Sequence, residues 1–462
     1  MTKFVNRNDE LCFLSKEYNR AGASFVVVYG RRRVGKTALA AHFMKNKPGL
    51  YFIATEENET ENKNAFKKII AEFTNNKLLM NASGLSWDAI FEVWLDFACD
   101  KKKLLIIDEF QYLGKANAAF PSVLQRIWDT KLKDENVMLI LCGSHISMME
   151  SQTLAYTSPL YGRRTGQIRL KQIPFSYYNE FFTDKTKKQL IPYYAVTGGI
   201  PKYIELFYDA EDIYTAIERN ILSKSSFLYD EPNFLLKREL SDVGSYFSIL
   251  KTIAAGSRKI SKIAAALELK QTGLTKYLKT LIELDILERC VPITENNPEK
   301  SKKGLYMIKD CFITFWFKFI FPNLSYIESG NTAHAVNKIK NNFIDSHVSY
   351  VYESLCIEKM WQLANANAWG FTFGKAGKWW NNITEIDIVA IDDDEKNIIF
   401  GECKYTNNEI GVNVLHELEK KSHQVDWYKS ERSNHFILFS VSGFTNELIN
   451  LSKARKDLIL AE

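Results

Sequence analysis

The sequence is poor in proline and cysteine and has no long apolar run. Its 462 residues include 10 prolines, which leaves no room for an extended low-complexity or collagen-like segment. The 7 cysteines are odd in number and form no CxxC pair, so neither a disulfide framework nor a cysteine zinc site is indicated. No apolar stretch follows Met1, and the aromatic run at 312–321 is interrupted by Lys318 and too short to cross a bilayer. We expect a folded cytoplasmic protein with reduced thiols and no membrane association.

Length and charge set the next limits. A chain of 462 residues is too long for one hydrophobic core, so we expect at least two large folded units. Hydrophobic residues make up 46% and charged residues 25%, as in ordinary globular domains. The formal net charge of +5 is small for this length, and it neither demands nor excludes a nucleic-acid partner. Local motifs must therefore indicate the function.

The first motif is a glycine-rich loop between a strand and a helix. Ser24–Tyr29 is a short apolar run that predicts a buried strand, and residues 38–44 are helix formers. Between them stands the pattern GxxxxGK[ST], in which backbone N–H groups surround phosphates, a lysine (Lys36) neutralises the β and γ oxygens and a hydroxyl (Thr37) ligates Mg²⁺. A strand-to-helix turn that fits the pattern by chance is the alternative. We predict that ATP and Mg²⁺ bind here, through Gly30, Arg31, Arg32, Arg33, Val34, Gly35, Lys36, Thr37 and Ala38.

The second motif is an apolar strand that ends in two acids. Residues 103–107 predict the strand, and Asp108 and Glu109 follow it directly. In P-loop enzymes the first acid of such a pair holds the hydration shell of the magnesium ion, and the second polarises the attacking water. We predict these roles for Asp108 and Glu109 in turn. Lys36 is predicted to be catalytic together with Glu109. Ordinary acids at the solvent end of a buried strand are the alternative.

Two more features follow a third apolar strand at 137–142. Ser144 would lie beside the γ-phosphate if this strand neighbours the other two, which makes it a candidate sensor; a turn serine is the alternative. Arg163 and Arg164 stand in a later loop and could supply positive charge to the transition state, within the chain or across a subunit interface. Arginines that are merely solvated fit the pattern equally well.

Together these residues resemble the archaeal-type ATPase family, which is related to the AAA and STAND nucleotide switches. The resemblance covers most of the chain and rests on residues 4–11, 30–37, 108–111, 143–144, 162–164 and 197–203. It implies a helical lid that begins at the glycine–proline segment 197–203. It also places Arg7 near the adenine side of the nucleotide.

The middle of the chain changes to short predicted helices. They span 246–255, 260–267 and 273–284, with a turn at 268–271, and are followed by strands at 286–291 and 305–308 around a tip at 296–304. This is the order of a winged helix-turn-helix. One acid, Glu268, stands here among six basic residues, namely Arg258, Lys259, Lys262, Lys270, Lys276 and Lys279. Contact with DNA phosphates is one interpretation, and an interdomain or protein-binding module is the other.

The last segment places charged residues on a predicted hairpin. Strands at 386–391 and 398–405 flank an acidic turn, and the alternation of side chains puts Glu402 and Lys404 on one face. Residues 424–428 follow on the next predicted helix and faintly match a QxxxY element. A hairpin with charged edges is the alternative.

This hairpin resembles that of the PD-(D/E)xK nuclease superfamily. The resemblance implies that a divalent cation is held by Asp387, Glu402 and the helix residue Glu353, while Lys404 orients or deprotonates water. No proline precedes Asp387, which departs from the pattern. The fold is often kept as a binding platform after catalysis is lost, so cleavage does not follow from the resemblance.

These features predict an α/β protein with a P-loop NTPase parallel sheet, a helical lid, a winged helix and a C-terminal α/β restriction-endonuclease-like domain. We expect these domains at 1–180, 181–240, 241–325 and 326–462. The predicted function is an ATP-hydrolysing switch coupled to a DNA-binding C-terminal domain, with cleavage and a second divalent metal left open. One alternative is a signalling ATPase whose inactive C-terminal domain binds a protein partner, and another is a DNA-binding regulator with ATP as a structural ligand. The sequence leaves homo-oligomer formation open.

Overall fold

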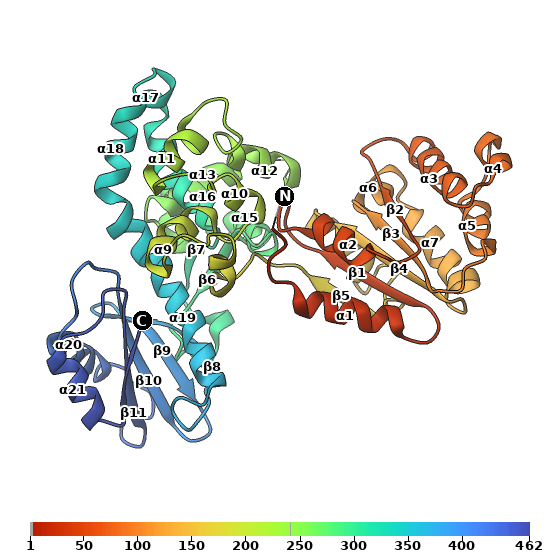
Figure 1. Cartoon of the computed structure of the whole chain (residues 1–462). Helices are drawn as coiled ribbons and strands as arrows, with labels where there is room; N and C mark the ends of the chain where they lie inside the picture. The colour runs from red at the N-terminus through yellow and green to blue at the C-terminus, as the bar shows by residue number, and fades with distance from the viewer. Residues whose placement is uncertain (1–2, 241) are drawn as a thin grey trace. The chain divides into compact units, whose positions relative to one another are not determined.

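The computed structural model describes residues 3–240 and 242–462, which form two compact units (Figure 1). Unit 1 extends to Phe181 and also includes Gly199–Glu205. Unit 2 contains Phe182–Gly198 and the chain from Leu206 onward. No helix in these described ranges is long and apolar enough to span a bilayer.

Unit 1 is built on a five-stranded parallel sheet with the order β2-β3-β4-β1-β5. Three of its strands were predicted from apolar runs, and the structure confirms them with bounds that differ by one residue at most. Every residue of β1 and β4 is buried, as expected for central strands covered on both faces. The strands are β1 (Ser24–Tyr29), β2 (Gly49–Ile53), β3 (Lys103–Asp108), β4 (Val137–Gly143) and β5 (Gly166–Arg169).

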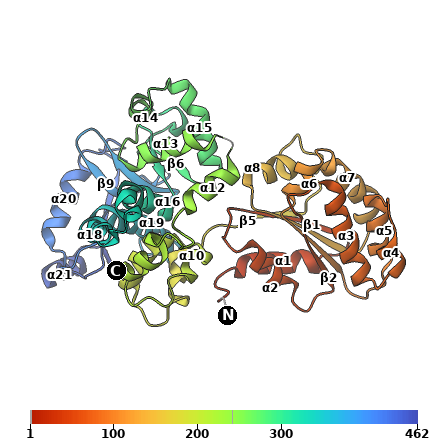
Figure 2. The ribbon, with the colours of Figure 1, turned by 90° about the horizontal axis from the view of Figure 1, so that it is seen from above.

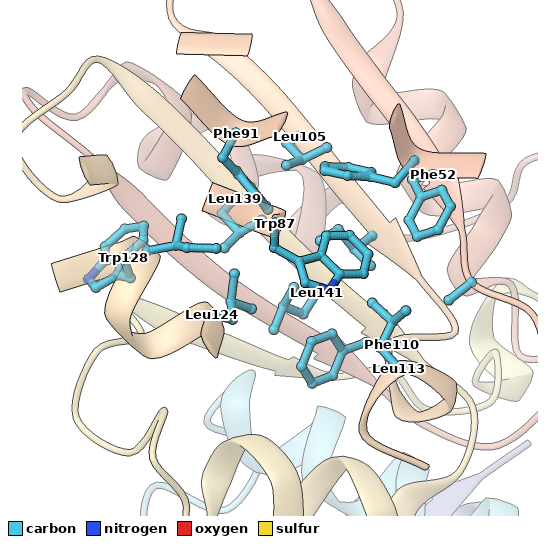
Figure 3. Close-up of a cluster of buried hydrophobic side chains, with 14 of the residues drawn as sticks. Phe52, Trp87, Phe91, Leu105, Phe110, Leu113, Leu124, Trp128, Leu139 and Leu141 are labelled. Carbon is cyan, nitrogen blue, oxygen red and sulfur yellow. The ribbon is translucent and has the colours of Figure 1, made fainter. Parts of the chain in front are cut away.

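Helices cover both faces of this sheet (Figure 2). Helices α1 (Asn8–Asn19) and α2 (Lys36–Met44) pack on one face, over buried aliphatic residues of β1, β3 and β4. The opposite face carries a larger aromatic and aliphatic core, part of which is shown in Figure 3. Its helices include α3 (Glu59–Phe73), α4 (Lys77–Asn81), α5 (Trp87–Asp96), α6 (Gln111–Ala116), α7 (Phe120–Ile127) and α8 (Ile146–Met149).

Unit 2 begins with helices and a small antiparallel sheet. The three helices predicted in the middle of the chain are present as α13 (Val243–Ala254), α14 (Ile260–Ala266) and α15 (Gln271–Glu283), and they precede the pair β6 (Leu287–Cys290) and β7 (Leu305–Ile308). Whether this order forms a winged helix stays a prediction. The other helices of this part are α9 (Lys187–Thr197), α11 (Ile213–Ile217), α12 (Glu231–Glu239), α16 (Cys311–Phe315), α17 (Leu324–Glu328) and α18 (Thr332–Phe343).

The second part of unit 2 is a mixed sheet with the order β12-β11-β10-β9-β8. Strands β8, β9 and β10 run antiparallel to one another, while β10, β11 and β12 are parallel. The predicted hairpin is confirmed as β9 and β10. The elements are α19 (Ser349–Asn365), β8 (Lys375–Trp380), β9 (Glu385–Asp392), β10 (Asn397–Lys404), α20 (Val412–Ser422), β11 (Ser433–Ser440), α21 (Asn446–Ala454) and β12 (Leu458–Ala461).

One prediction for this part is wrong. Residues 424–428 were expected on the helix after the hairpin, but α20 ends at Ser422 and these residues lie in the loop that follows it. Val425 is buried there and Tyr428 has a positive φ of 41°, a backbone conformation that a helix does not contain. Sequence periodicity alone could not separate this loop from the end of the helix.

Candidate functional site

The glycine-rich loop connects β1 to α2 through two glycines that no other residue could replace without strain. Gly30 has φ 153°, and a Cβ atom there would lie 2.3 Å from the carbonyl oxygen of Leu170. Gly35 has φ 98° and stands directly before the first residue of α2. The loop therefore wraps tightly at its start and turns into the N-terminus of the helix, where backbone N–H groups favour an anion.

Lys36 is buried inside this loop. Its Nζ donates hydrogen bonds to the carbonyl oxygens of Gly30 and Arg31, at 2.9 and 2.8 Å. Burial lowers the pKa of Lys36, and the carboxylates of Glu109 and Asp108 oppose that shift. Phosphate oxygens would have to replace the two carbonyl groups as partners of the ammonium group. Arg33, with φ 69°, and Ala38 in the first turn of α2 complete the predicted binding segment.

Asp108 ends β3 beside the loop and is only 3% exposed. Its Oδ2 accepts hydrogen bonds from the Thr37 hydroxyl, at 3.0 Å, and from the Tyr51 hydroxyl. Its Oδ1 accepts one from the backbone N–H of Glu109 at 2.9 Å. Burial first, and then Asp108, raises the pKa of Tyr51, so this phenol stays protonated as a donor. Thr37 and Asp108 thus place two hard oxygens next to each other, which suits Mg²⁺.

Glu109 is held by donors on neighbouring elements. Its backbone has φ 53°, and its Oε2 accepts hydrogen bonds from the Ser144 hydroxyl at 2.7 Å and from Gln111 Nε2 at 2.5 Å. Burial by itself would raise the pKa of Glu109, but the donors Gln111 and Ser144, with the charges of Arg32 and Lys36, outweigh burial and lower it. The carboxyl group is therefore ionised at neutral pH.

Strand β4 brings Ser144 into the site. Strand β4 pairs with β3 on one side and with β1 on the other. The strand that precedes Ser144 therefore neighbours the two strands that lead to the glycine-rich loop and to Asp108. Ser144 is buried and its hydroxyl contacts Glu109, while its role as a sensor stays a prediction. Arg32, from the loop, donates to the Tyr112 hydroxyl at 3.0 Å.

Arg7 precedes α1 and reaches the same loop. Its Nη2 donates to the carbonyl oxygens of Val34, at 3.0 Å, and Lys171, at 2.6 Å, and its Nη1 contacts Glu10 at 3.2 Å. Burial lowers the pKa of this guanidinium, while Glu10 opposes the shift. Arg7 therefore fastens the N-terminal segment to the glycine-rich loop.

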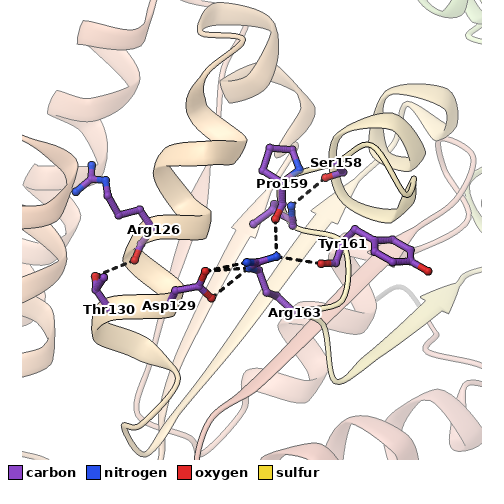
Figure 4. Close-up of polar contacts among 8 residues, drawn as sticks. Arg126, Asp129, Thr130, Ser158, Pro159, Tyr161 and Arg163 are labelled. Atoms are coloured by element: carbon purple, nitrogen blue, oxygen red, sulfur yellow. Dashed lines mark hydrogen bonds and ion pairs between the residues drawn. The ribbon is translucent and has the colours of Figure 1, made fainter.

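Arg163, the first of the two later arginines, lies in a separate polar cluster of unit 1 (Figure 4). Arg163 donates to both carboxylate oxygens of Asp129, with Nη2 to Oδ2 at 2.9 Å, and to the carbonyl oxygens of Pro159 and Tyr161 at 3.0 and 3.1 Å. The guanidinium of Arg164 lies 5.6 Å from the centroid of the Tyr161 ring. Arg163 thus has local partners, and its predicted action on a transition state stays a prediction.

The acids of the C-terminal sheet have lysine partners. Glu402 Oε1 accepts from Lys404 at 2.8 Å, and its Oε2 from Lys421 at 2.9 Å. Glu353, on α19, pairs with Lys378 of β8. Burial raises the pKa of Glu353 to about 7, against the effect of Lys378.

Asp387 lies in β9 next to these acids. Its Oδ2 accepts a hydrogen bond from the backbone N–H of Cys403 at 2.9 Å. Burial, and after it the charge of Glu402, raises the pKa of Asp387. In residues 3–240 and 242–462, with Glu353, Asp387 and Glu402 among them, no three His, Cys, Asp or Glu side chains converge closely enough to hold a metal ion. A second divalent cation at these acids therefore stays a prediction.

Three residues of these sites were not predicted from the sequence, namely Tyr51, Lys378 and Lys421, and Gln111 stood in the recognised segment 108–111 without a predicted role. Tyr51 lies on β2, two residues before Ile53, the register partner of Asp108. The strand itself was not predicted, so the signal was missing. Lys378 and Lys421 reach their acids from other elements, and only the pairing of β8 with β9 and the position of α20 bring them there.

A parallel sheet with a glycine-rich loop, its lysine, and a contact between a threonine in the first turn of α2 and an aspartate at the end of β3 defines a P-loop ATPase. Residues 4–207 match a family model described as an ATPase domain predominantly from Archaea, and residues 316–422 match archaea bacterial proteins of unknown function. Uncharacterized protein MJECL04 of Methanocaldococcus jannaschii is 38% identical over 406 residues, which are 87% of each chain. The chain belongs to this family of archaeal-type ATPases.

Two more proteins are similar to parts of the chain. Uncharacterized ATP-binding protein MJ0423 of Methanocaldococcus jannaschii is 52% identical over 44 residues, 10% of this chain and 75% of that one. The solved structure of the Walker-type ATPase PABY2304 of Pyrococcus abyssi covers 68% of this chain and 96% of its own, with a TM-score of 0.53 and 20% identity. At this identity the likeness shows the fold alone.

Proposed function

We propose that unit 1 binds ATP with Mg²⁺ and hydrolyses it as a molecular switch. The observation that carries the proposal is the 3.0 Å contact between the hydroxyl of Thr37 and the carboxylate of Asp108, beside the buried ammonium group of Lys36. Lys36 and Thr37 begin α2, which follows β1, and Asp108 ends β3; in the sheet, β4 lies between β1 and β3. Their convergence supplies two oxygens for a hard cation and one positive charge for phosphate oxygens.

Each residue has a distinct part in this proposal. Thr37 and Asp108 would hold the Mg²⁺ ion, which when bound neutralises negative charge on the phosphate oxygens. The ammonium group of Lys36 then donates its hydrogen bonds to the β- and γ-phosphate oxygens of ATP instead of to the loop carbonyl oxygens. Glu109, kept ionised by Ser144 and by its other neighbours, orients water and accepts a proton from it.

The test separates binding from turnover. Glu109→Gln keeps the shape of the side chain but removes the proton acceptor, so we expect ATP binding to persist while phosphate release falls about 100-fold or more. Glu92→Gln, on the surface of α5 in the same unit, is the matched control and should change neither. Unchanged phosphate release in the Glu109 variant would remove water activation from the proposal.

We further propose that unit 2 binds nucleic acid through a winged helix at α13–α15 with β6 and β7, and through a PD-(D/E)xK-like sheet. The order of the elements around both sheets supports this assignment. So does the exposure of five of the basic residues, namely Lys259, Lys262, Lys270, Lys276 and Lys279. The four-domain division at 180, 240 and 325 belongs to the same proposal.

Two observations bear on whether this sheet also cleaves nucleic acid. The lysine partners of Glu353 and Glu402 favour a binding platform, because they neutralise acids that a metal would need. Metal-dependent cleavage is the second candidate, and it is favoured by the adjacency of Asp387, Glu402 and Lys404 on neighbouring strands. In that case Lys404 would orient water.

Incubation with single- and double-stranded DNA and RNA, in Mg²⁺ or Mn²⁺, tests the second candidate. We expect binding without cleavage. Cleavage by the wild type that Asp387→Ala abolishes would establish the nuclease instead, whereas cleavage by both would indicate a contaminant. Phosphate release measured with and without DNA then tests the coupling of the two units; no response to DNA would favour the signalling ATPase with a protein partner.

A further inference from the structure

Three cations converge on one exposed aromatic ring in unit 2. Tyr350, the second residue of α19, is 43% exposed. Around its ring centroid lie Arg258 Cζ at 5.7 Å, Lys318 Nζ at 5.6 Å and Lys378 Nζ at 5.6 Å. Arg258 precedes α14, Lys318 lies in the short π-helix Trp316–Ile320 that follows α16, and Lys378 belongs to β8. Four separate elements therefore assemble this cluster, which we call the Tyr350 cluster.

Of the three cations, Lys378 forms ion pairs with carboxylates in the described part of unit 2. Its partners are Glu353 and, at 3.7 Å, Glu385, whereas Lys318 donates to the backbone carbonyl of Ser346. In the part of the chain that the structure describes, the guanidinium of Arg258 has no carboxylate within ion-pair distance. Burial, and after it the charge of Arg258, lowers the pKa of Lys318. An anion placed among these groups would relieve their mutual repulsion.

We propose that the Tyr350 cluster binds a single-stranded nucleic-acid segment, with a phosphate among the three cations and a base against the exposed ring of Tyr350. This proposal rests on the nucleic-acid binding proposed for unit 2 and names its ligand class and its contact residues. An aromatic face beside a positive groove is the chemistry that single strands use, because an unpaired base offers a π face that a duplex keeps stacked.

The location of the cluster adds a second argument. Lys378 connects it to Glu353, and Glu353 neighbours Asp387 of the acid group on the C-terminal sheet. The backbone N–H of Ile293 also donates to the carbonyl oxygen of Lys378 at 3.0 Å, so the segment after β6 is fixed to β8. A nucleic-acid single strand bound at the Tyr350 cluster would therefore pass beside Glu353 and Asp387.

Binding of labelled oligo-dT, oligo-U and a DNA duplex to the full chain, measured by fluorescence anisotropy over a range of salt concentrations, tests the proposal. We expect the wild type to prefer the single strands. Tyr350→Leu should weaken their binding about tenfold or more, whereas Tyr350→Phe should retain it. Arg258→Gln should reduce the slope of log affinity against log salt by about 0.7, the value for one contact with a single-strand phosphate.

Lys338→Gln, at an exposed position of α18, is the matched control, because it removes one charge of unit 2 outside both proposed binding surfaces and should leave single-strand binding unchanged. If the wild type binds none of the three probes, the proposed nucleic-acid function of unit 2 fails. If it binds but Tyr350→Leu and Arg258→Gln bind like the wild type, that function stands and the Tyr350 cluster is refuted. A loss confined to duplex binding would equally refute it.

Discussion

Replacing Lys36 by methionine tests the glycine-rich loop most directly. The substitution removes an ammonium group that donates to Gly30 and Arg31 at 2.9 and 2.8 Å, and it keeps an unbranched side chain of similar length. Burial already opposes the charge of Lys36, as its lowered pKa shows, so an apolar replacement should fold. Without ATP we expect a Tm within a few degrees of the wild-type value.

The expected loss lies in ATP binding. Two hydrogen bonds from a charged donor to phosphate oxygens contribute at least about 3 kcal/mol together, which corresponds to roughly a 100-fold weaker Kd. At an ATP concentration about 100 times the wild-type Kd, the ligand stabilises the wild type by about 2.7 kcal/mol. The variant at the same concentration gains about 0.4 kcal/mol. For a unit of this size these values correspond to Tm increases of about 5–11 °C and about 1–2 °C.

Thermal unfolding with and without Mg-ATP measures both quantities. Lys45→Met is the matched control, because Lys45 is exposed directly after α2 and the charge lost is the same. The control should keep the full ATP-dependent shift. If Lys36→Met also kept it, the loop would not bind the triphosphate through its lysine, and the roles of Thr37 and Asp108 would lose their basis.

Two other predictions follow from the pKa shifts. Ser144→Ala removes a donor that lowers the pKa of Glu109, so the acid limb of the profile of kcat against pH should move to higher pH; an unmoved limb would contradict the contact. Burial raises the pKa of Glu353 to about 7 from 4.5, so the native state binds the extra proton between these values and its free energy of unfolding falls as pH rises, by up to about 3 kcal/mol. Glu353→Gln should flatten this dependence in urea unfolding at pH 5 and pH 8, and an unchanged slope would assign it to another group.

Local pattern was sufficient for the elements that build the ATP site. β1 has the bounds that its apolar run predicts, because a parallel strand that is covered on both faces is apolar along its length. The loop and Asp108 were likewise predicted, since each motif is contiguous in the sequence. The contacts of Tyr51 and Gln111 with the two acids depend on strand register and on side-chain direction, which a contiguous pattern does not encode.

The C-terminal sheet shows the same limit more strongly. Its hairpin and its acids were predicted, but the lysines that pair with them come from β8 and α20, outside the recognised pattern. Those long-range partners decide whether Glu353 and Glu402 can hold a cation. The sequence therefore predicted the charged residues without predicting their electrostatic state.

The short helix α10 (Pro201–Glu205) has a consequence for how the chain can be divided. It belongs to unit 1, where Tyr203 and Ile204 are buried and Pro201 lies next to Gly35 of the glycine-rich loop, yet the residues on both sides of Gly199–Glu205 belong to unit 2. A gene shortened after Phe181 would thus encode an ATPase sheet that lacks a piece of its own packing. In the intact chain, a movement of α10 caused by the glycine-rich loop would displace both of the peptide segments that join Gly199–Glu205 to unit 2.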